Sequence, residues 1–531
     1  MATQYIKKYL SCKPGIDKDG TRFDSESYID GQHVRFYRGK PKKIGGYKIG
    51  FTGTTEIVRA LSIPPLSLAS PTSSEAATVV NKALVFMGRP SSLKSGIIDI
   101  YLNTTPLIDR TPVGIVPSVN NTWDFGYYTQ ASVDSNVNYV IAHLDPNNNN
   151  FNGNVEGGVY IGITNDSAPL VPITYVGGDP VIVSGSICTI GQFIIAYGND
   201  GVIVWSDPTD VNAPWPVDNF QEIAPTKIIT AAESTGGGVP TGLFWSTNSL
   251  LRLSYNVIEG NWNVNVLQQN TPILSKNCVV TVDSVFYWLE INRFVQFTGV
   301  INELPNIYNK RFLFDNLNYA QRTKVWGIVI AEWNEIWWFV PLNDSDECNH
   351  VIIHNYATKD WYDTALARTC GYVSEIFTYP IMADCNSTRD LSSPPPPGQL
   401  PPMVYPLWVH EYGTDQVMFG YSYAIPSYYQ TNITSLFDNS PTDDYQVRTR
   451  RIEADFKRTG TISVQIQGWA FANSTPIKSD IYVLSPTDYK VDTNFMSRLS
   501  SYIFTSNDVG GDYQAGKVLL DFVPGDQRPG S

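Results

Sequence analysis

Residues 192–206 read QFIIAYGNDGVIVWS, two short apolar runs separated by Gly198, Asn199, Asp200 and Gly201. Each run is too short for a helix and is rich in Ile, Val and aromatic side chains, as strands are. Gly beside Asn and Asp supplies the positive φ angles that a tight turn needs. The stretch therefore predicts an antiparallel β-hairpin.

Similar short runs follow one another from residue 56 to about residue 390, which predicts an antiparallel meander. A coarser period lies on top of this pattern, because an apolar-aromatic step recurs about every 40 to 50 residues, the size of one four-stranded propeller blade. The steps are Val204-Trp205, Phe244-Trp245, Tyr287-Trp288 and Trp337-Trp338. A β-propeller-like domain is expected, and a β-sandwich with similar local patches is the alternative.

The composition is that of an all-β chain. Aromatic residues make up 13% of the 531 residues, and 40 Gly and 35 Pro supply turns. Charged residues are only 16%, against about 25% in a usual globular protein. Aromatic side chains suit the half-buried surface of a pleated sheet, so the fold class that we expect is all-β.

The net charge of −13 argues against free association with nucleic acid, because tight DNA binding needs Lys and Arg to replace condensed counterions. The alternative that an acidic protein surface surrounds DNA that passes through it remains open. Residues 1–50 differ from the rest, with eleven Lys or Arg against five Asp or Glu. This basic segment predicts a solvated or partner-facing arm, and direct DNA contact is the alternative.

Four segments follow from these patterns. Residues 1–55 predict an N-terminal arm with one or two strands, and residues 56–390 the β-propeller-like domain. Residues 391–403 contain SSPPPPGQLPP, which must run extended as a connector or loop because proline has no backbone N–H. Residues 404–531 alternate in β fashion again and predict an additional β-sandwich or platform domain, which can pack with the N-terminal arm.

No motif for catalysis, a cofactor or a metal is present. The six cysteines lack CxxC spacing, and Cys348, His350 and His354 lie too far apart along a strand to share one zinc ion. A glycosidase would need paired carboxylates. Candidate acids are Asp207, Asp210, Asp283, Glu290, Glu332 and Glu335, but most such acids are simply solvated. We therefore expect no enzyme activity and no cofactor.

Nine short segments resemble the tail tube or nozzle proteins of short-tailed (podovirus) bacteriophages, and they occur in the order seen in that family. They are 28–36 (YIDGQHVRF), 43–47 (KIGGY), 244–251 (FWSTNSLL), 334–339 (NEIWWF), 355–362 (NYATKDWY), 366–369 (LART), 380–383 (PIMA), 410–415 (HEYGTD) and 521–528 (DFVPGDQR). The resemblance touches both ends and the middle of the chain. The Pro-rich stretch and an Asn-rich stretch at 147–150 depart from it.

The resemblance implies a homohexameric nozzle beneath an adaptor ring, with propellers outside and a β platform around the DNA channel. Such a nozzle retains genomic DNA and then lets it pass without sequence-specific binding. The implied partners are other copies of the chain, the adaptor or portal-proximal tail protein, and a tail fibre or needle protein. The implied location is the virion tail, after assembly in the bacterial cytoplasm. With no signal peptide and no apolar run of about 18 residues, no stable membrane insertion is expected.

Two sets of site residues follow. We expect Trp205, Trp245, Trp288, Trp337 and Trp361 to pack in sheet cores or between blades rather than to bind a ligand. We expect Arg35, Arg38, Lys40, Lys42 and Lys43 to dock on the adaptor rather than to grip DNA, because a ring of such contacts would slow its passage. The alternative function is a carbohydrate-binding or carbohydrate-degrading propeller that acts as a receptor-binding tail protein. It requires a deep pocket with converging carboxylates or stacked Trp rings.

Overall fold

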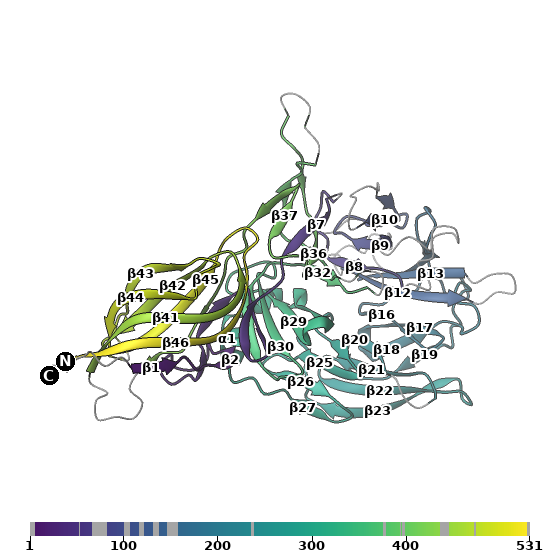
Figure 1. Ribbon diagram of the computed structural model, residues 1–531. Helices are drawn as coiled ribbons and strands as arrows, with labels where there is room; N and C mark the ends of the chain where they lie inside the picture. Colours follow the sequence, from purple (N-terminus) through teal and green to yellow (C-terminus); the bar gives the residue numbers. More distant parts are fainter. Residues whose placement is uncertain are drawn as a thin grey trace.

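The computed structural model describes residues 6–52, 54–65, 82–99, 107–115, 122–130, 137–145, 158–234, 238–374, 377, 379–392, 395, 399–435, 445–471 and 474–527. The Asn-rich stretch at 147–150 and part of the Pro-rich stretch lie outside these residues. The described chain is all-β, with a β-propeller-like domain beside a β-sandwich (Figure 1). Helical segments among the described residues are short: α1 (Lys310–Asn316), η1 (Asn199–Gly201), η2 (Tyr319–Lys324) and η3 (Ala331–Trp333).

Six sheets of the propeller have four strands each, and the four strands of a sheet are consecutive in the chain. The first blade contains β8 (Ala60–Ser62), β9 (Lys82–Gly88), β10 (Leu93–Asp99) and β11 (Ile108–Asp109), and the second contains β12 (Trp123–Gln130), β13 (Val137–Leu144), β14 (Gly158–Ile163) and β15 (Val171–Pro172). The third contains β16 (Ser186–Ile190), β17 (Phe193–Tyr197), β18 (Val202–Trp205) and β19 (Phe220–Glu222), and the fourth contains β20 (Ile228–Glu233), β21 (Thr241–Ser246), β22 (Ser249–Asn256) and β23 (Asn261–Gln269). The fifth contains β24 (Val280–Val282), β25 (Val285–Leu289), β26 (Phe294–Phe297) and β27 (Ile301–Glu303), and the sixth contains β28 (Trp326–Ile330), β29 (Glu335–Val340), β30 (His350–Asn355) and β31 (Trp361–Ala365). The hairpin at 192–206 is β17 and β18, and Asp200 takes φ 53° in its turn.

A seventh sheet closes the ring and is assembled from distant parts of the chain. Its order is β32 (Cys370–Tyr372), β33 (Ile381–Ala383), β36 (Leu407–His410), β7 (Tyr47–Phe51), β37 (Gln416–Met418) and β38 (Tyr421–Tyr423). The innermost strand β32 contacts β28 on one side and β8 on the other. Because β7 comes from the N-terminal segment, this blade is complete only when residues near 50 pair with residues near 410.

The Pro-rich stretch does not separate two domains. It lies between β34 (Thr388–Arg389) and β35 (Met403–Val404), which pair with each other and project from the seventh sheet (Figure 1). Since β33 pairs directly with β36, the chain leaves the sheet and returns to it. The propeller therefore extends beyond residue 390, to β38.

The sandwich consists of two sheets that both ends of the chain build together. One has the order β44 (Lys490–Ser497), β41 (Tyr445–Thr459), β46 (Asp512–Gln527), β6 (Lys40–Lys43), β5 (Val34–Tyr37), with β1 (Ile6–Tyr9) also on β46. The other has the order β4 (Asp30–Gln32), β39 (Ser427–Gln430), β45 (Leu499–Ser506), β42 (Ile462–Trp469), β43 (Ile477–Leu484), with β40 (Thr434–Ser435) on β45. The short strands β2 (Lys13–Ile16) and β3 (Ser27–Tyr28) pair in parallel.

The N-terminal segment does pack with the C-terminal β domain, but it is not an arm of only one or two strands. Strands β1, β4, β5 and β6 are integral to the sandwich, and β7 is integral to the propeller. The physical reason is that β1, β4 and β7 pair with strands hundreds of residues away, while β5 and β6 pair with each other and β6 joins this hairpin to β46.

The five tryptophans singled out in the sequence all lie inside hydrophobic clusters, with 2% exposure or less. Trp245 on β21 and Trp288 on β25 meet edge to face across two neighbouring blades, with ring centroids 5.6 Å apart. Trp337 and Trp338 point to opposite faces of β29 and join different clusters. Aromatic packing thus fills the space between blades.

Replacing Trp288 with Ala should lower the free energy of unfolding by about 3–5 kcal/mol, because a fully buried ring leaves a cavity. Phe220→Ala is the matched control, since Phe220 is 56% exposed and its loss should change stability by less than about 0.5 kcal/mol. Urea unfolding followed by tryptophan-independent circular dichroism measures both. Equal stability of the two variants would contradict the packing role.

Candidate functional site

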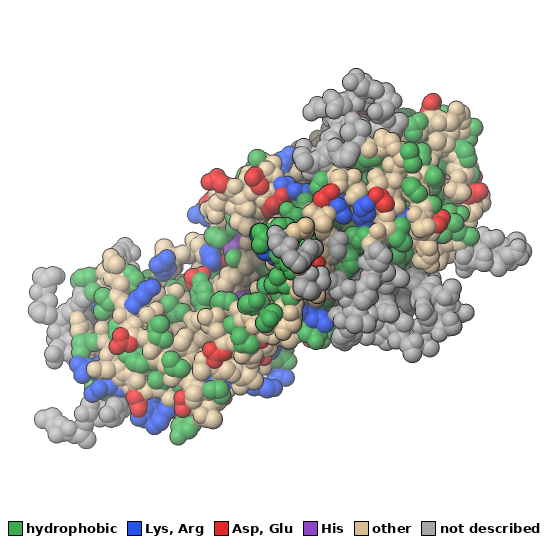
Figure 2. Space-filling view, turned by 90° about the horizontal axis from the view of Figure 1, so that it is seen from above, with side chains coloured by type: hydrophobic (Ala, Val, Ile, Leu, Met, Phe, Trp, Pro, Cys, Tyr) green, Lys and Arg blue, Asp and Glu red, His purple; other side chains and the backbone are tan. Residues whose placement is uncertain are grey.

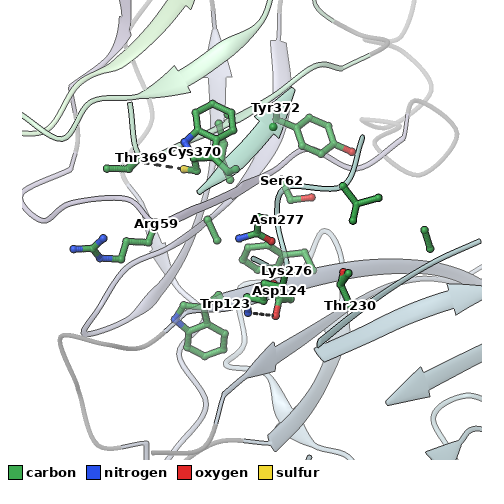
Figure 3. Close-up of a pocket in the computed structure, with 18 of the residues that line it drawn as sticks. Arg59, Ser62, Trp123, Asp124, Thr230, Lys276, Asn277, Thr369, Cys370 and Tyr372 are labelled. Atoms are coloured by element: carbon green, nitrogen blue, oxygen red, sulfur yellow. Dashed lines mark hydrogen bonds and ion pairs between the residues drawn. The ribbon is translucent and has the colours of Figure 1, made fainter. Parts of the chain in front are cut away.

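The inner strands of the propeller surround an axial pocket of about 330 Å³ (Figure 3). Its lining comes from six blades and includes Arg59, Ser62, Trp123, Asp124, Thr230, Lys276, Asn277, Thr369, Cys370 and Tyr372. In a propeller this is the usual place for a ligand, because every blade contributes side chains to it. The pocket is therefore the first candidate for chemistry.

The charged groups of this pocket already have partners within the chain. Lys276 Nζ lies 2.6 Å from Asp124 Oδ2, and Arg59 donates to both oxygens of Glu347, at 2.7 and 3.1 Å. Burial alone would raise the pKa of Asp124, but Lys276 and His143 hold it well below its ordinary value. The carboxylate is thus kept ionised as half of an ion pair, which is a structural rather than an acid-base role.

Other lining groups are equally occupied. Trp123 Nε1 donates to Arg89 O, and Trp326 Nε1 donates to Arg368 O while its ring stacks on Phe339. Burial raises the pKa of the Cys370 thiol to about 12, so it is no nucleophile near neutral pH.

Neither the axial pocket nor the pocket between the third and fourth blades contains a pair of carboxylates. Asp124 is the single carboxylate of the axial pocket, and Glu233 is that of a second pocket, of about 750 Å³, between the third and fourth blades. None of the six candidate acids named from the sequence lines either pocket. Within the described residues, no three His, Cys, Asp or Glu side chains gather as a metal site.

The second candidate is the junction between the propeller and the sandwich, where a buried guanidinium joins three sheets. Arg35 on β5 is 1% exposed, and its side chain reaches Glu335 on β29 and Glu411 just after β36. Its Nη atoms donate to Glu411 at 2.7 and 2.8 Å and to Glu335 at 3.1 Å. Nε lies 3.0 Å from Glu335 Oε1 as an ion-pair contact without hydrogen-bond geometry.

Neighbouring donors complete the shell around the two carboxylates. Tyr362 and Trp337 donate to Glu335 at 2.5 and 2.8 Å, and Trp333 donates to Glu411 at 3.1 Å while its ring lies 4.4 Å from the Arg35 guanidinium. Burial raises the pKa of Glu335, Arg35 opposes the rise, and the Glu411 charge adds to it. Glu335 and Glu411 share the single cation Arg35, so loss of any one of these three residues would leave a buried charge without its partner.

A second ion cluster lies along the same junction. Asp363 on β31 is fully buried and accepts from His350 at 2.8 Å and from Lys18 at 3.1 Å, and Lys18 also lies 3.4 Å from Asp30. Asp19, next in the chain, caps α1 of the propeller by accepting the N–H groups of Arg311 and Phe312, both at 2.7 Å. The segment around residues 18–19 thus fastens the sandwich to the sixth blade and to α1.

Close backbone approach explains the Gly45-Gly46 pair. A Cβ on Gly46 would lie 2.4 Å from backbone atoms of Asp415, so only glycine fits. In the fitted arrangement Gly46 N donates to Gly413 O, and Tyr47 N donates to Asp415 O. The turn at 411–415 and the linker before β7 are therefore held together by their backbones.

The predicted docking residues are only partly accessible. Arg35 is buried in the junction, and Lys43 is 2% exposed and donates to Gly511 O at 2.7 Å, so the expectation that these two dock on a neighbour is wrong. Their charge is used inside the chain, because the sheets around them supply carboxylates and a carbonyl. Arg38 is exposed, and Lys40 and Lys42 are half-buried, with Lys42 Nζ 3.8 Å from Asp512.

Sequence reasoning missed most of the junction. It placed Glu335 among solvated acids and gave no role to Glu411, Lys18 or Asp363. A signal was present for Glu411, because it lies in one of the family-like segments, but its φ of 60° and its partner 376 residues away could not be foreseen.

No family model matches the chain, and no curated protein matches it. Among solved structures it is similar to a provisionally named 6-phosphogluconolactonase from Bacteroides uniformis ATCC 8492, with 10% identity and a TM-score of 0.35 over 65% of this chain and 94% of that one. YCF48 bound to D1 peptide matches with 10% identity and a TM-score of 0.35 over 69% and 97%. Sqt1 from Chaetomium thermophilum matches with 9% identity and a TM-score of 0.31 over 64% and 96%. Such low values say nothing about function.

Arg35→Met should lower the free energy of unfolding by about 3–5 kcal/mol, because it leaves two carboxylates buried without their cation. Lys42→Met removes a half-buried charge on the neighbouring strand, which lies 3.8 Å from the more exposed Asp512, and should cost at most about 1 kcal/mol. Chemical denaturation measures both. A neutral Arg35→Met would show that the junction does not depend on the guanidinium.

Lys18→Met should make the protein unfold at a higher pH on acidification. Burial alone would raise the pKa of Asp363, but His350 and Lys18 hold it below its ordinary value. The folded pKa is therefore below the unfolded one of about 4, so the ionised group stabilises the fold above that value and the contribution is lost as the pH falls through the folded pKa. Without Lys18 the folded pKa rises and the loss begins earlier. Lys310→Met, which breaks an exposed pair with Glu303, should leave the acid midpoint unchanged.

Proposed function

We propose that this protein is a structural subunit of a bacteriophage tail nozzle, a ring of identical chains that forms the distal DNA conduit, retains the genome and allows its ejection. The observation that carries the proposal is where the family-like segments lie. Arg35, Glu335 and Glu411 come from three of those segments, which are up to 376 residues apart in the chain and meet at one buried site.

Further contacts between those segments support the same idea. Arg368 Nε donates to His410 Nε2 at 2.9 Å, Tyr362 donates to Glu335, and Gly46 pairs with Gly413. Several of the family-like segments thus meet at or beside the junction, whereas segment 244–251 lies in the fourth blade and Thr369 of segment 366–369 lines the axial pocket. A buried junction that holds the propeller rigidly against the sandwich suits a subunit of a stiff tube better than it suits an enzyme.

Charge is divided between the two domains. Residues 47–426 contain 17 Lys or Arg against 33 Asp or Glu, whereas residues 1–46 and 427–531 together contain 20 against 17. Basic side chains accordingly appear at the sandwich end (Figure 2). A channel lined by the nearly balanced sandwich would neither hold the phosphate backbone tightly nor strongly repel it.

The carbohydrate-active alternative has less support. Retaining and inverting glycosidases both need two carboxylates at the sugar, and the axial pocket supplies one, already paired with Lys276. Its tryptophan rings are fixed by hydrogen bonds and stacking within the chain.

Particles assembled without this chain should package DNA and then lose it, and antibodies against the chain should label the distal tip of the tail. Electron microscopy and DNase protection measure these outcomes. The ring should contain several copies, six if the family symmetry holds. A single peripheral copy, or full DNA retention without the chain, would rule out the nozzle role. Release of reducing sugar from host polysaccharide, lost in Asp124→Asn, would favour the alternative.

Because Arg35 and Lys43 are buried, we propose that only the accessible basic residues Arg38, Lys40 and Lys42 dock on an adaptor. Arg38→Ser with Lys40→Ser should weaken attachment of the chain to the particle, whereas Lys478→Ser with Lys490→Ser, the same charge change on exposed residues elsewhere in the sandwich, should not. Quantitative mass spectrometry of purified particles gives the copy number of the chain in each case. Full occupancy in the first variant would exclude this docking surface.

A further inference from the structure

The outermost strand of the fourth blade differs from the outer strands of the other blades. β23 runs for nine residues, Asn261–Gln269, with the sequence NWNVNVLQQ. Among the described strands, the outer ones of the other blades are β11, β15, β19, β27, β31 and β38, which span two to five residues. β31, the longest of these, is buried apart from its last residue.

β23 lacks most of the features that protect an edge strand, and its one irregularity, a register shift opposite Leu250 and Leu251, lies just beyond Val266. Proteins shield such edges with charges, proline, bulges or short length, because open backbone groups can pair with another chain. β23 contains no charged residue, no proline and no glycine, and Val264 and Val266 are 38% and 49% exposed. It lies at the outer rim of the propeller (Figure 1).

The direction of the open backbone groups follows from Trp262. Its N–H donates to Gln221 Oε1 at 3.0 Å, and its carbonyl accepts from Gln221 Nε2 at 2.8 Å, so both groups point away from β22. Backbone direction alternates along an antiparallel strand. The N–H and C=O groups of Val264 and Val266 therefore point outward as well, and among the described residues no hydrogen bond reaches them.

The contact with Gln221 shows that the edge of β23 forms hydrogen bonds with an amide group. The side-chain amide of Gln221 comes from β19 of the third blade and makes the two hydrogen bonds that the C=O and N–H of one residue of an added antiparallel strand would make. The edge is thus partly occupied by a peptide mimic at Trp262 and open at the next two outward positions.

We propose that β23 is a docking site for an extended segment of another protein, which adds as a further strand to the fourth blade and hydrogen-bonds to the backbones of Val264 and Val266. Strand addition of this kind takes its affinity from backbone bonds and its selectivity from alternate side chains. The two valines favour uncharged, β-branched residues on the facing side of the incoming strand.

Charge decides against a second copy as the occupant. Two propellers that each carry 33 acidic against 17 basic residues in segment 47–426 repel each other, whereas a segment flanked by Lys or Arg is attracted. The partner is therefore an extended segment with uncharged pairing residues and basic flanks. This site does not depend on the nozzle role.

The probe is a fluorescent synthetic peptide of alternating Thr and Val with lysines at both ends, titrated into the full-length chain. Fluorescence anisotropy should show saturable binding. Residue-resolved hydrogen–deuterium exchange should slow at the amides of Val264 and Val266. The amides of Asn263 and Asn265 point toward β22 and should not change.

Two variants test the geometry. Val264→Lys with Val266→Lys, and separately Val266→Pro, which removes one outward N–H and is tolerated at an edge, should each weaken binding about tenfold or more. Val257→Lys with Ile258→Lys adds the same charge at exposed residues of the adjacent turn and should leave binding unchanged. Absent binding, equal binding by all variants, or a homodimer that the β23 variants dissociate would each overturn the proposal.

Discussion

The buried guanidinium of Arg35 is the contact on which the arrangement of the two domains depends. It comes from the sandwich and is bound by one carboxylate of the sixth blade and one next to the seventh. A buried ion pair is not in itself a strong source of stability, because desolvation offsets most of the attraction. Its effect is selective, since any other placement of the domains would leave one or two charges buried and unpaired. The surrounding hydrophobic cluster includes residues of both domains.

The path of the chain explains how Arg35 reaches the junction between the two domains. The N-terminal segment enters the sandwich, crosses the junction, supplies β7 to the last blade, and only then begins the first blade. After the seventh sheet the chain returns to finish the sandwich. Both domains are therefore closed by strands from opposite ends of the sequence, and neither can be completed by a local segment. Such non-local closure lengthens the search for the native fold.

The sequence predicts local structure such as hairpins, but it does not predict which residues far apart in the chain contact one another. The hairpin at 192–206 could be predicted because its turn chemistry and its two apolar runs are adjacent. The propeller-like fold could be predicted from a period that matches one blade, and the burial of Trp245 and Trp288 from their position on strands. The role of Arg35 could not, because a charged residue in a polar, turn-rich segment is usually exposed, and both of its partners lie hundreds of residues away. The Pro-rich stretch could be predicted to be a connector or a loop, but the sequence did not show that the strands on either side of it pair with each other.

Calorimetric unfolding of the full chain tests most directly whether the junction makes one body of the two domains. If it does, heat unfolding of the wild-type chain shows one transition whose van't Hoff and calorimetric enthalpies agree. In Arg35→Met the propeller and the sandwich then unfold in two separate transitions. Two transitions already present in the wild-type chain, and unmoved by the substitution, would contradict a junction that couples the domains.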